Sequence, residues 1–286
     1  MTDLAPLPPN VIQPIVRCAL DEDFGTAGDV TANLLIPAKE TGKLYFKSRA
    51  EGVISGMQAA EMTFGMVDPS VKFKVMRGNG SRVKAGDVIA WVSGPVRSML
   101  MAERTALNFL GRMSGIATLT SQYVDLTQHT KARIAATRKT TPGLRALEKR
   151  AVLAGGGYTH RQSLSDAIMI KDNHIALAGG IEKALKNIMA NADHMVRVSV
   201  EVDTHAQLKK ALPFAPHVVL LDNMSPDELR EAVAIVDAFD GPRPTLEASG
   251  GVNLETVKAI SETGIDVISV GALTHSATNF DIGLDA

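Results

Sequence analysis

After residue 130, strand-like and helix-like patterns of hydrophobic positions alternate along the chain. Short, nearly continuous apolar runs are each followed by a segment with the 3.6-residue period of an amphipathic helix. Nearly continuous apolar runs are typical of parallel strands that are buried on both faces. The pattern predicts about six β-α units, with strands in the segments 132–137, 166–172, 196–204, 217–223, 245–251 and 266–273.

The helices expected after these strands lie at 144–154, 180–191, 205–212, 225–239 and 253–264. The fourth has a strong start signal, since Ser225 is a good N-cap, Pro226 follows it, and acidic residues occupy the first turn. The first strand has no G-x-G-x-x-G motif after it, so a closed α/β barrel fits better than an open, doubly wound dinucleotide-binding sheet.

The first 115 residues have a different pattern. Strand-like runs at 43–50, 71–75 and 88–92 are separated by glycine-containing turns such as Gly86-Asp87. A long amphipathic helix is expected from 98 to 124, and it would link this part to the β-α units. Its apolar positions at helical spacing include Leu100, Leu107, Leu110 and Met113.

Composition and charge exclude several classes of protein. The chain has 286 residues, 45% of them hydrophobic, and a net charge of −1, so no global field would draw it to nucleic acid or to an anionic membrane. Cys18 is the only cysteine, which excludes an intramolecular disulfide, argues against a cysteine-based zinc site and favours a reducing cytoplasm. Neither a signal peptide nor an apolar run long enough to span a membrane is recognisable.

Polar residues or glycines end every strand of the predicted barrel. In α/β barrels the chemistry lies at the carboxyl ends of the strands, so these residues are the candidate site. In chain order they are Arg138 with Lys139, Lys171 with Asp172 and Asn173, Glu201 with Asp203, Asp222 with Asn223, Glu247 with Ser249, and Ser269 with Gly271. Any one pair alone reads as solvated surface, but charges collected at one barrel mouth need each other or a ligand.

Two further segments indicate an anion. The loop 154–166 combines three glycines with His160 and Arg161, although a flexible surface loop with a basic tip would look the same. Small residues follow the last two strands, at 248–251 and 270–273. Such positions often hold a phosphate on backbone N–H groups, the alternative being simple tight turns. The residues together predict a small, phosphate-bearing anionic ligand such as a sugar phosphate carrying Mg²⁺.

Several motifs go further. The segments "ERTALNFLGRMSGIAT", "TRKTTPGLRALEKRAVLAGGGYTHRQSLSDAIMIKDNHI", "EVDT", "LLDNMSP", "EASGG" and "ISVGALTHS" resemble the quinolinate phosphoribosyltransferase family, as does "DFGTAGDVTANLLIP" near the start. The resemblance implies an N-terminal α/β sandwich lobe, residues 1–115, to which the tail 275–286 returns. It also implies an incomplete, six- to seven-stranded α/β barrel, residues 116–274, and a homodimer whose active sites are shared between chains.

The family's reaction would convert quinolinate and phosphoribosyl pyrophosphate into nicotinate mononucleotide, pyrophosphate and CO₂, with Mg²⁺, in NAD biosynthesis. The resemblance implies that Arg138, His160 and Arg161 bind quinolinate together with Arg104 of the neighbouring chain. Lys139 and Lys171 would face pyrophosphate and carboxylate charge, while Glu201 and Asp222 would bind the ribose hydroxyls and Mg²⁺. Ser249, Gly250, Gly251 and Gly271 would hold the 5′-phosphate, with His275 close to the phosphates.

Two alternatives stay open from the sequence. One is a related phosphoribosyltransferase that acts on nicotinate or another aromatic acid, and release of CO₂ from quinolinate would distinguish the two. The other is a non-catalytic protein that binds anions with the same site. Glu201 and Asp222 argue against that second reading, because capture of an anion gains nothing from carboxylates.

Overall fold

The computed structural model describes residues 5–286, which divide into two compact units. The first comprises residues up to Ser121 together with Thr140–Gly156 and Leu273–Ala286, and the second comprises Gln122–Lys139 and Gly157–Ala272. The expected boundary at residue 115 falls inside one long helix, and a segment expected within the barrel domain, 140–156, belongs to the first unit.

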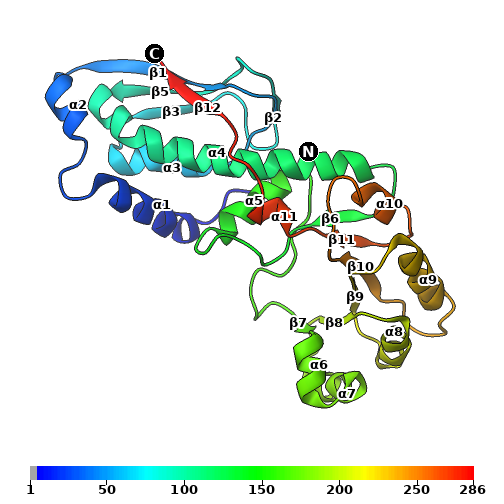
Figure 1. The fold of residues 1–286 in the computed structure, drawn as a ribbon. Helices are drawn as coiled ribbons and strands as arrows, with labels where there is room; N and C mark the ends of the chain where they lie inside the picture. Colours follow the sequence, from blue (N-terminus) through cyan, green and yellow to red (C-terminus); the bar gives the residue numbers. More distant parts are fainter. Residues whose placement is uncertain (1–4) are drawn as a thin grey trace. The chain divides into compact units, whose positions relative to one another are not determined.

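The first unit is built on a four-stranded sheet with the order β12-β1-β5-β3, in which every pairing is antiparallel. Helices α3 and α4 pack against one face of this sheet (Figure 1). Its elements are α1 (Pro9–Phe24), α2 (Val30–Leu35), β1 (Thr41–Ser48), β2 (Gly52–Val53), α3 (Met57–Val67), β3 (Lys72–Val75), β4 (Arg82–Val83), β5 (Val88–Pro95), most of α4 (Val96–Thr127), α5 (Arg145–Ala154), most of α11 (Ala272–His275) and β12 (Ile282–Asp285).

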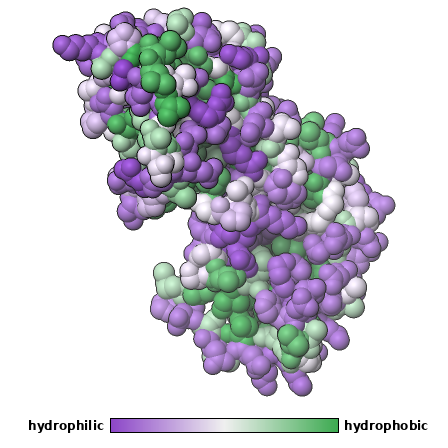
Figure 2. Space-filling model, turned by 60° about the vertical axis from the view of Figure 1, so that its left-hand side comes forward, coloured by the Kyte–Doolittle hydropathy of each residue, from purple (hydrophilic) through white to green (hydrophobic). Residues whose placement is uncertain are grey.

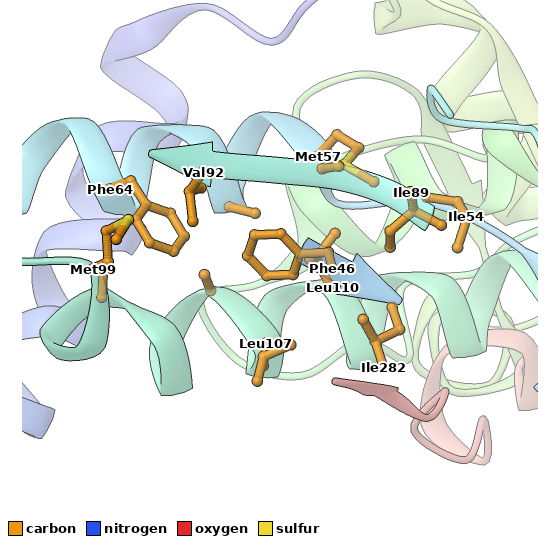
Figure 3. Close-up of a cluster of buried hydrophobic side chains, with 14 of the residues drawn as sticks. Phe46, Ile54, Met57, Phe64, Ile89, Val92, Met99, Leu107, Leu110 and Ile282 are labelled. Atoms are coloured by element: carbon orange, nitrogen blue, oxygen red, sulfur yellow. The ribbon is translucent and has the colours of Figure 1, made fainter. Parts of the chain in front are cut away.

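The core of this unit lies between the sheet and its two helices. Figure 3 shows Phe46 of β1 between side chains of β5 and of helix α4. The rings of Phe46 and Phe64 meet edge to face at 5.9 Å between centroids, a favourable aromatic geometry. Ile282 of β12 joins this core, because the chain's last strand pairs with β1 through the register Ser48↔Ile282. The returning tail therefore completes the first unit.

The second unit contains six parallel strands in the order β6-β11-β10-β9-β8-β7, with helices along their outside (Figure 1). Among the described residues 5–286, β6 and β7 are the outermost strands of this sheet, with Tyr158 added to β6 by a single bridge, so the barrel is incomplete. The elements are β6 (Arg133–Ala135), β7 (Ile168–Ile170), α6 (Asp172–Ala178), α7 (Ile181–Asn191), β8 (Val198–Val202), α8 (His205–Ala211), the 3₁₀ turn η1 (Leu212–Phe214), β9 (Val218–Asp222), α9 (Pro226–Asp237), β10 (Thr245–Ser249), α10 (Val257–Ser261) and β11 (Val267–Ser269).

The predicted strands and helices of this unit are confirmed, and the local reasons are visible. All five residues of β8 are buried, as expected for a strand covered on both faces. Ser225 accepts the backbone N–H of Glu228, whose side chain in turn accepts the backbone N–H of Ser225 at 2.8 Å, a complete capping box. The α/β fold class expected from the sequence, with its antiparallel lobe and parallel six-stranded unit, is therefore correct.

Hydrophilic residues cover most of the face drawn in Figure 2, with smaller hydrophobic patches between them. On the short helix α2, Val30 is 57% exposed, Leu34 is 90% exposed and Leu35 is 73% exposed. In the part of the chain that the structure describes, no helix is both long and apolar enough to cross a membrane.

Candidate active site

The parallel strands place six of the predicted segments at one edge of the second unit. Arg138 and Lys139 follow β6, Lys171 directly follows β7, and Gly271 follows β11. Glu201 lies within β8, and the pairing Ser249↔Asp222 sets the ends of β10 and β9 side by side. The carboxyl ends of parallel strands meet at one edge, so this is the barrel mouth that the sequence predicts.

Lys171 and Glu201 form an ion pair across neighbouring strands. The Nζ of Lys171 contacts Oε2 of Glu201, whose side chain is only 9% exposed, whereas that of Lys171 is 45% exposed. The backbone N–H of Lys171 donates to Nδ1 of His174 at 3.0 Å, which fixes the start of α6. The buried carboxylate thus holds a partly exposed cation at the mouth. The sequence predicts both residues but gives no sign that they pair.

Asp222 is in a different electrostatic state from Glu201. Burial raises the pKa of its carboxyl group, and nearby Asp203 raises it further, while Lys171, Ser249 and Lys139 act to lower it. The net direction is upward, so the ionised form of Asp222 is less favoured here than in water. A carboxylate in this state gains from any cation that a ligand brings to it.

A close contact between two loops shapes the ends of β9 and β10. The backbone N–H of Asn223, which has a positive φ of 55°, donates to the carbonyl of Ser249 at 2.8 Å. Gly250 has φ +90°, and a Cβ there would lie 2.1 Å from Oδ1 of Asn223. Only glycine fits this position, and Gly251 follows with φ +62°. The two glycines predicted for phosphate binding are therefore backbone requirements of the loop as well.

Two arginines of the second unit, Arg138 and Arg161, interact with each other. Burial lowers the pKa of Arg161, and the nearby guanidinium of Arg138 lowers it further, while Asp166 opposes them. The Nη1 of Arg161 donates to the carbonyl of Ala167 at 3.0 Å, which holds this side chain in place. Two guanidinium groups that repel each other across a partly buried site are stabilised by an anion between them.

His160 contacts Glu247, which in turn pairs with Ser269; the sequence names Glu247 and Ser269 as strand-end residues but gives them no individual role. Glu247 of β10 is 3% exposed, accepts the hydroxyl of Ser269 on β11, and lies 3.5 Å from Nε2 of His160. A cavity of about 310 Å³ beside them is lined by His160, Arg161, Glu247 and, at the amino ends of the strands, Arg133 and Arg197. The inward position of a charged residue on a buried strand was the available signal for Glu247.

Arg104 and His275 belong to the first unit. Arg104 is an exposed residue of α4, and its charge acts against the burial that raises the pKa of Glu103. His275 is exposed at the end of α11, with Nδ1 2.7 Å from the hydroxyl of Ser276. Of the thirteen residues to which the family resemblance gives a role, the structure thus places eleven in the second unit and these two in the first.

Models of known protein families identify the family of this chain. Residues 29–114 match the model described as the quinolinate phosphoribosyl transferase N-terminal domain, and residues 116–285 match the C-terminal domain of the same family. The chain belongs to the quinolinate phosphoribosyltransferase family.

Curated relatives of this family cover most of the chain. It is 40% identical over 264 residues to the probable nicotinate-nucleotide pyrophosphorylase (carboxylating) of Bacillus subtilis, covering 92% of this chain and 89% of the relative. It is 42% identical over 289 residues to the mitochondrial quinolinate phosphoribosyltransferase (decarboxylating) 2a of Nicotiana tabacum, covering 94% of this chain and 80% of the relative.

Solved structures of family members have the same fold. The crystal structure of NadC from Streptococcus pyogenes matches with a TM-score of 0.93 at 36% identity, covering 99% of this chain and 98% of that one. The nicotinate-nucleotide pyrophosphorylase from Francisella tularensis matches with a TM-score of 0.89 at 35% identity, covering 98% of this chain and 97% of that one. At this similarity over both units, the family's fold is the fold of the whole chain.

Proposed function

We propose that this chain transfers the phosphoribosyl group of phosphoribosyl pyrophosphate to quinolinate and releases CO₂, giving nicotinate mononucleotide and pyrophosphate for NAD biosynthesis. The names of relatives at 40% and 42% identity support this reaction. The observation that carries the proposal is that the second unit holds an interacting arginine pair as well as a pair of neighbouring carboxylates. Paired guanidinium groups at Arg138 and Arg161 accompany two carboxylates, Glu201 and Asp222, at neighbouring strand ends.

Quinolinate carries two carboxylates, so it needs paired, directional donors. Arginine offers a planar fork that matches a carboxylate in a bidentate geometry, and Arg138 and Arg161 supply two such forks. Binding the dicarboxylate between them relieves their mutual repulsion. Nicotinate is disfavoured, because its single carboxylate would leave one guanidinium uncompensated.

The acidic residues suit the ribose end of the reaction. Departure of pyrophosphate leaves positive charge on the ribose ring, and the carboxylates of Glu201 and Asp222 stabilise that charge and accept hydrogen bonds from its hydroxyls. Lys139 and Lys171 stabilise the negative charge of the leaving group. The pyridine nitrogen then bonds to the ribose, and the resulting pyridinium withdraws electrons from the adjacent carbon. That carbon loses its carboxylate as CO₂ and takes up a proton, so no protein nucleophile is required.

The phosphate end is formed by backbone and small side chains. Ser249, Gly250 and Gly251 follow β10, and Gly271 follows β11. Positive φ at both Gly250 and Gly251 turns the chain sharply after β10, and backbone N–H groups in such a turn are able to bind an anion. We assign the 5′-phosphate to this loop; the role of His275, which belongs to the first unit, stays a prediction from the family resemblance.

The donor set also fits Mg²⁺. Glu201 and Asp222 both interact with Lys171, so two carboxylates share one neighbourhood. Among residues 5–286, no three His, Cys, Asp or Glu side chains form a metal-binding group, so these two carboxylates would hold the ion together with substrate oxygens. When bound, Mg²⁺ neutralises charge on the departing pyrophosphate.

We expect activity to vanish in EDTA and to return with added Mg²⁺, and full activity after exhaustive chelation would exclude this role.

We also propose a homodimer in the cytoplasm. The exposed apolar side chains of α2, which include Leu34 at 90% exposure, support an assembly of copies, since soluble surfaces rarely leave such residues grouped without a partner. A single cysteine, Cys18, supports a reducing compartment.

Substrate choice tests the proposed function. Purified protein is incubated with phosphoribosyl pyrophosphate and Mg²⁺, and with either quinolinate or nicotinate, and nicotinate mononucleotide is measured by mass spectrometry. We expect product in the incubation with quinolinate and none in the incubation with nicotinate. Product from nicotinate alone would identify the related phosphoribosyltransferase reaction instead. Tight binding of both substrates with no product from either would favour a non-catalytic anion-binding protein.

A further inference from the structure

A buried carboxylate lies inside the barrel without a place in the chemistry described above. The side chain of Glu247 is 5% exposed, and its two oxygens have different partners. Oε1 accepts the hydroxyl of Ser269 from the neighbouring strand β11, and Oε2 lies 3.5 Å from Nε2 of His160. Burying a carboxylate costs several kcal/mol of folding free energy unless it is well paired. A buried carboxylate such as Glu247 therefore either has a function or lowers the stability of the fold.

The contacts of His160 define which of its nitrogens carries the proton. Nδ1 accepts the backbone N–H of Arg161 at 2.9 Å, so Nδ1 is the unprotonated nitrogen in this arrangement. We therefore assign the proton to Nε2, the nitrogen that faces Glu247. Glu247 thus sets both the tautomer of His160 and the orientation of its ring. The ring in turn holds the main chain of Arg161.

Packing alone does not hold this ring. The cavity of about 310 Å³ is lined by His160, Arg161 and Glu247 together, so free space adjoins all three. A side chain that borders a cavity has room to change rotamer, because fewer neighbours oppose its rotation. The contact of Nε2 with Glu247 is therefore one of the interactions that orient the His160 ring.

We propose that Glu247 is a positioning residue for the carboxylate-binding arginine. The chain of contacts runs from Ser269 through Glu247 and His160 to the backbone of Arg161, and it fixes Arg161 where it receives a carboxylate of the pyridine substrate. This inference rests on the proposed function for the role of Arg161, but the network itself does not. Glu247 acts through His160 and does not touch the substrate.

Kinetics of matched variants test the positioning role. Glu247→Leu keeps most of the volume and removes the acceptor, so we expect the KM for quinolinate to rise roughly tenfold. The KM for phosphoribosyl pyrophosphate should stay within about threefold of wild type. Glu247→Gln keeps a carbonyl oxygen for Nε2–H and an amide for the Ser269 hydroxyl, so it should restore most of the quinolinate affinity. If Gln is as damaging as Leu, or if both KM values rise equally, the proposal is overturned.

Two serines provide a matched control. Ser269 is 4% exposed and donates to Glu247, whereas Ser199 is 7% exposed, lines the same cavity, and has no hydrogen-bond partner for its hydroxyl among the described residues. Ser269→Ala should raise the quinolinate KM by about threefold to tenfold, because the Glu247 carboxylate loses a charge-assisted hydrogen bond. Ser199→Ala should leave it unchanged. Equal effects of the two changes would contradict the network.

A spectroscopic readout separates this inference from the proposed function. The chain has seven histidines, and the ¹⁵N signals of the His160 ring are assigned by their loss in His160→Gln. The wild-type ring should be a single Nε2-protonated tautomer, and Glu247→Leu should convert it to a mixture. A fixed tautomer in a protein that does not turn over quinolinate would support the network and count against the proposed function only. A mixture of tautomers in wild type would overturn the network.

Discussion

At Asp222, ionisation costs more in the folded protein than in the unfolded chain, because burial raises the pKa of the carboxyl group above its ordinary value of 3.8. The folded state binds this proton more tightly, so Asp222 lowers stability as pH rises from 3.8 through the higher folded pKa. The residue's presence despite this cost is explained by a ligand that needs its charge.

Asp222→Asn should therefore keep or raise the free energy of unfolding at neutral pH while it lowers phosphoribosyl transfer. The stability difference from wild type should shrink as pH falls well below 3.8, where the wild-type carboxyl is protonated in both states. Denaturant unfolding at several pH values, with activity measured on the same samples, checks both parts. A large loss of stability at neutral pH would show that the charge of Asp222 stabilises the fold instead.

Gly250 gives a second prediction at this scale. Gly250→Ala combines positive φ with a Cβ placed 2.1 Å from Oδ1 of Asn223 and 2.9 Å from its backbone nitrogen. We expect a loss of about 3 kcal/mol in unfolding free energy together with weaker phosphoribosyl pyrophosphate binding. Gly251→Ala is the control: its φ is +62° but nothing lies within 4 Å of the added Cβ, so about 1 kcal/mol is expected. Equal losses at the two positions would show that backbone strain alone matters.

The location of these residues at one edge of the sheet was predictable from sequence, because the carboxyl ends of parallel strands converge. Asp222 and Ser249 are far apart in the chain, yet each ends an apolar run, and the parallel register sets them opposite each other. Partners were not predictable, because an ion pair such as Lys171–Glu201 depends on rotamers and strand stagger. The fine geometry of Glu247 and His160 depends on the same variables.

At the scale of elements, one buried ion pair joins α4 to α5. Glu148 is fully buried, and Arg112 donates to its Oε1 from Nε at 3.1 Å and from Nη2 at 2.8 Å. The backbone N–H and the hydroxyl of Thr141 also donate to Glu148, at 3.0 and 2.7 Å. Arg112 further donates to the carbonyls of Thr274 and Ala277, so one guanidinium connects three segments of the first unit.

Arg112→Ala should destabilise the protein by about 3–5 kcal/mol, because it leaves the Glu148 carboxylate buried without its cation. Arg230→Ala is the matched control, since within residues 5–286 the ion pair found for Arg230 is with exposed Asp227 on α9, and a loss below about 1 kcal/mol is expected there. Thermal and denaturant unfolding of both variants provide the measurement. A loss for Arg112→Ala as small as that of the control would mean that water enters and solvates Glu148.

Elements with a strong period were predictable, and elements fixed by distant contacts were not. The apolar stripe of α4 and the buried runs of β8 and β9 are local signals. The membership of α5 in the first unit depends on its pairing with Arg112, which no local pattern records. The seven-residue helix α6 has no buried residues and therefore no apolar stripe to predict it.

For the whole molecule, the proposed dimer makes Arg104 of one chain serve the barrel of the other. Arg104→Ala and Lys171→Ala should each be nearly inactive alone. When the two variants are refolded together, random pairing makes about half of the dimers mixed, and one site in each mixed dimer has both residues, so roughly one quarter of all sites should recover. Activity no higher than the average of the separate variants, with mixed dimers shown to be present, would exclude the shared site.

The predictions about assembly depended more on the family resemblance than on any pattern of residues. The spacing of Leu100, Arg104 and Leu107 places a cation beside an apolar stripe, which a snorkelling surface residue would also show. In the structure Leu107 is buried and Arg104 is exposed, so the stripe faces its own unit and the cation faces outward. Complementation between variants, and not the pattern, is what decides the role of Arg104.

The proposed reaction couples phosphoribosyl transfer to decarboxylation, and release of labelled CO₂ measures that coupling directly. Quinolinate labelled in the carboxylate next to the ring nitrogen is incubated with phosphoribosyl pyrophosphate, Mg²⁺ and the protein, and labelled CO₂, nicotinate mononucleotide and pyrophosphate are measured over time. We expect the three products to appear in equal amounts, with no CO₂ when phosphoribosyl pyrophosphate is omitted. Mononucleotide formed without labelled CO₂, or CO₂ released without phosphoribosyl pyrophosphate, would contradict it.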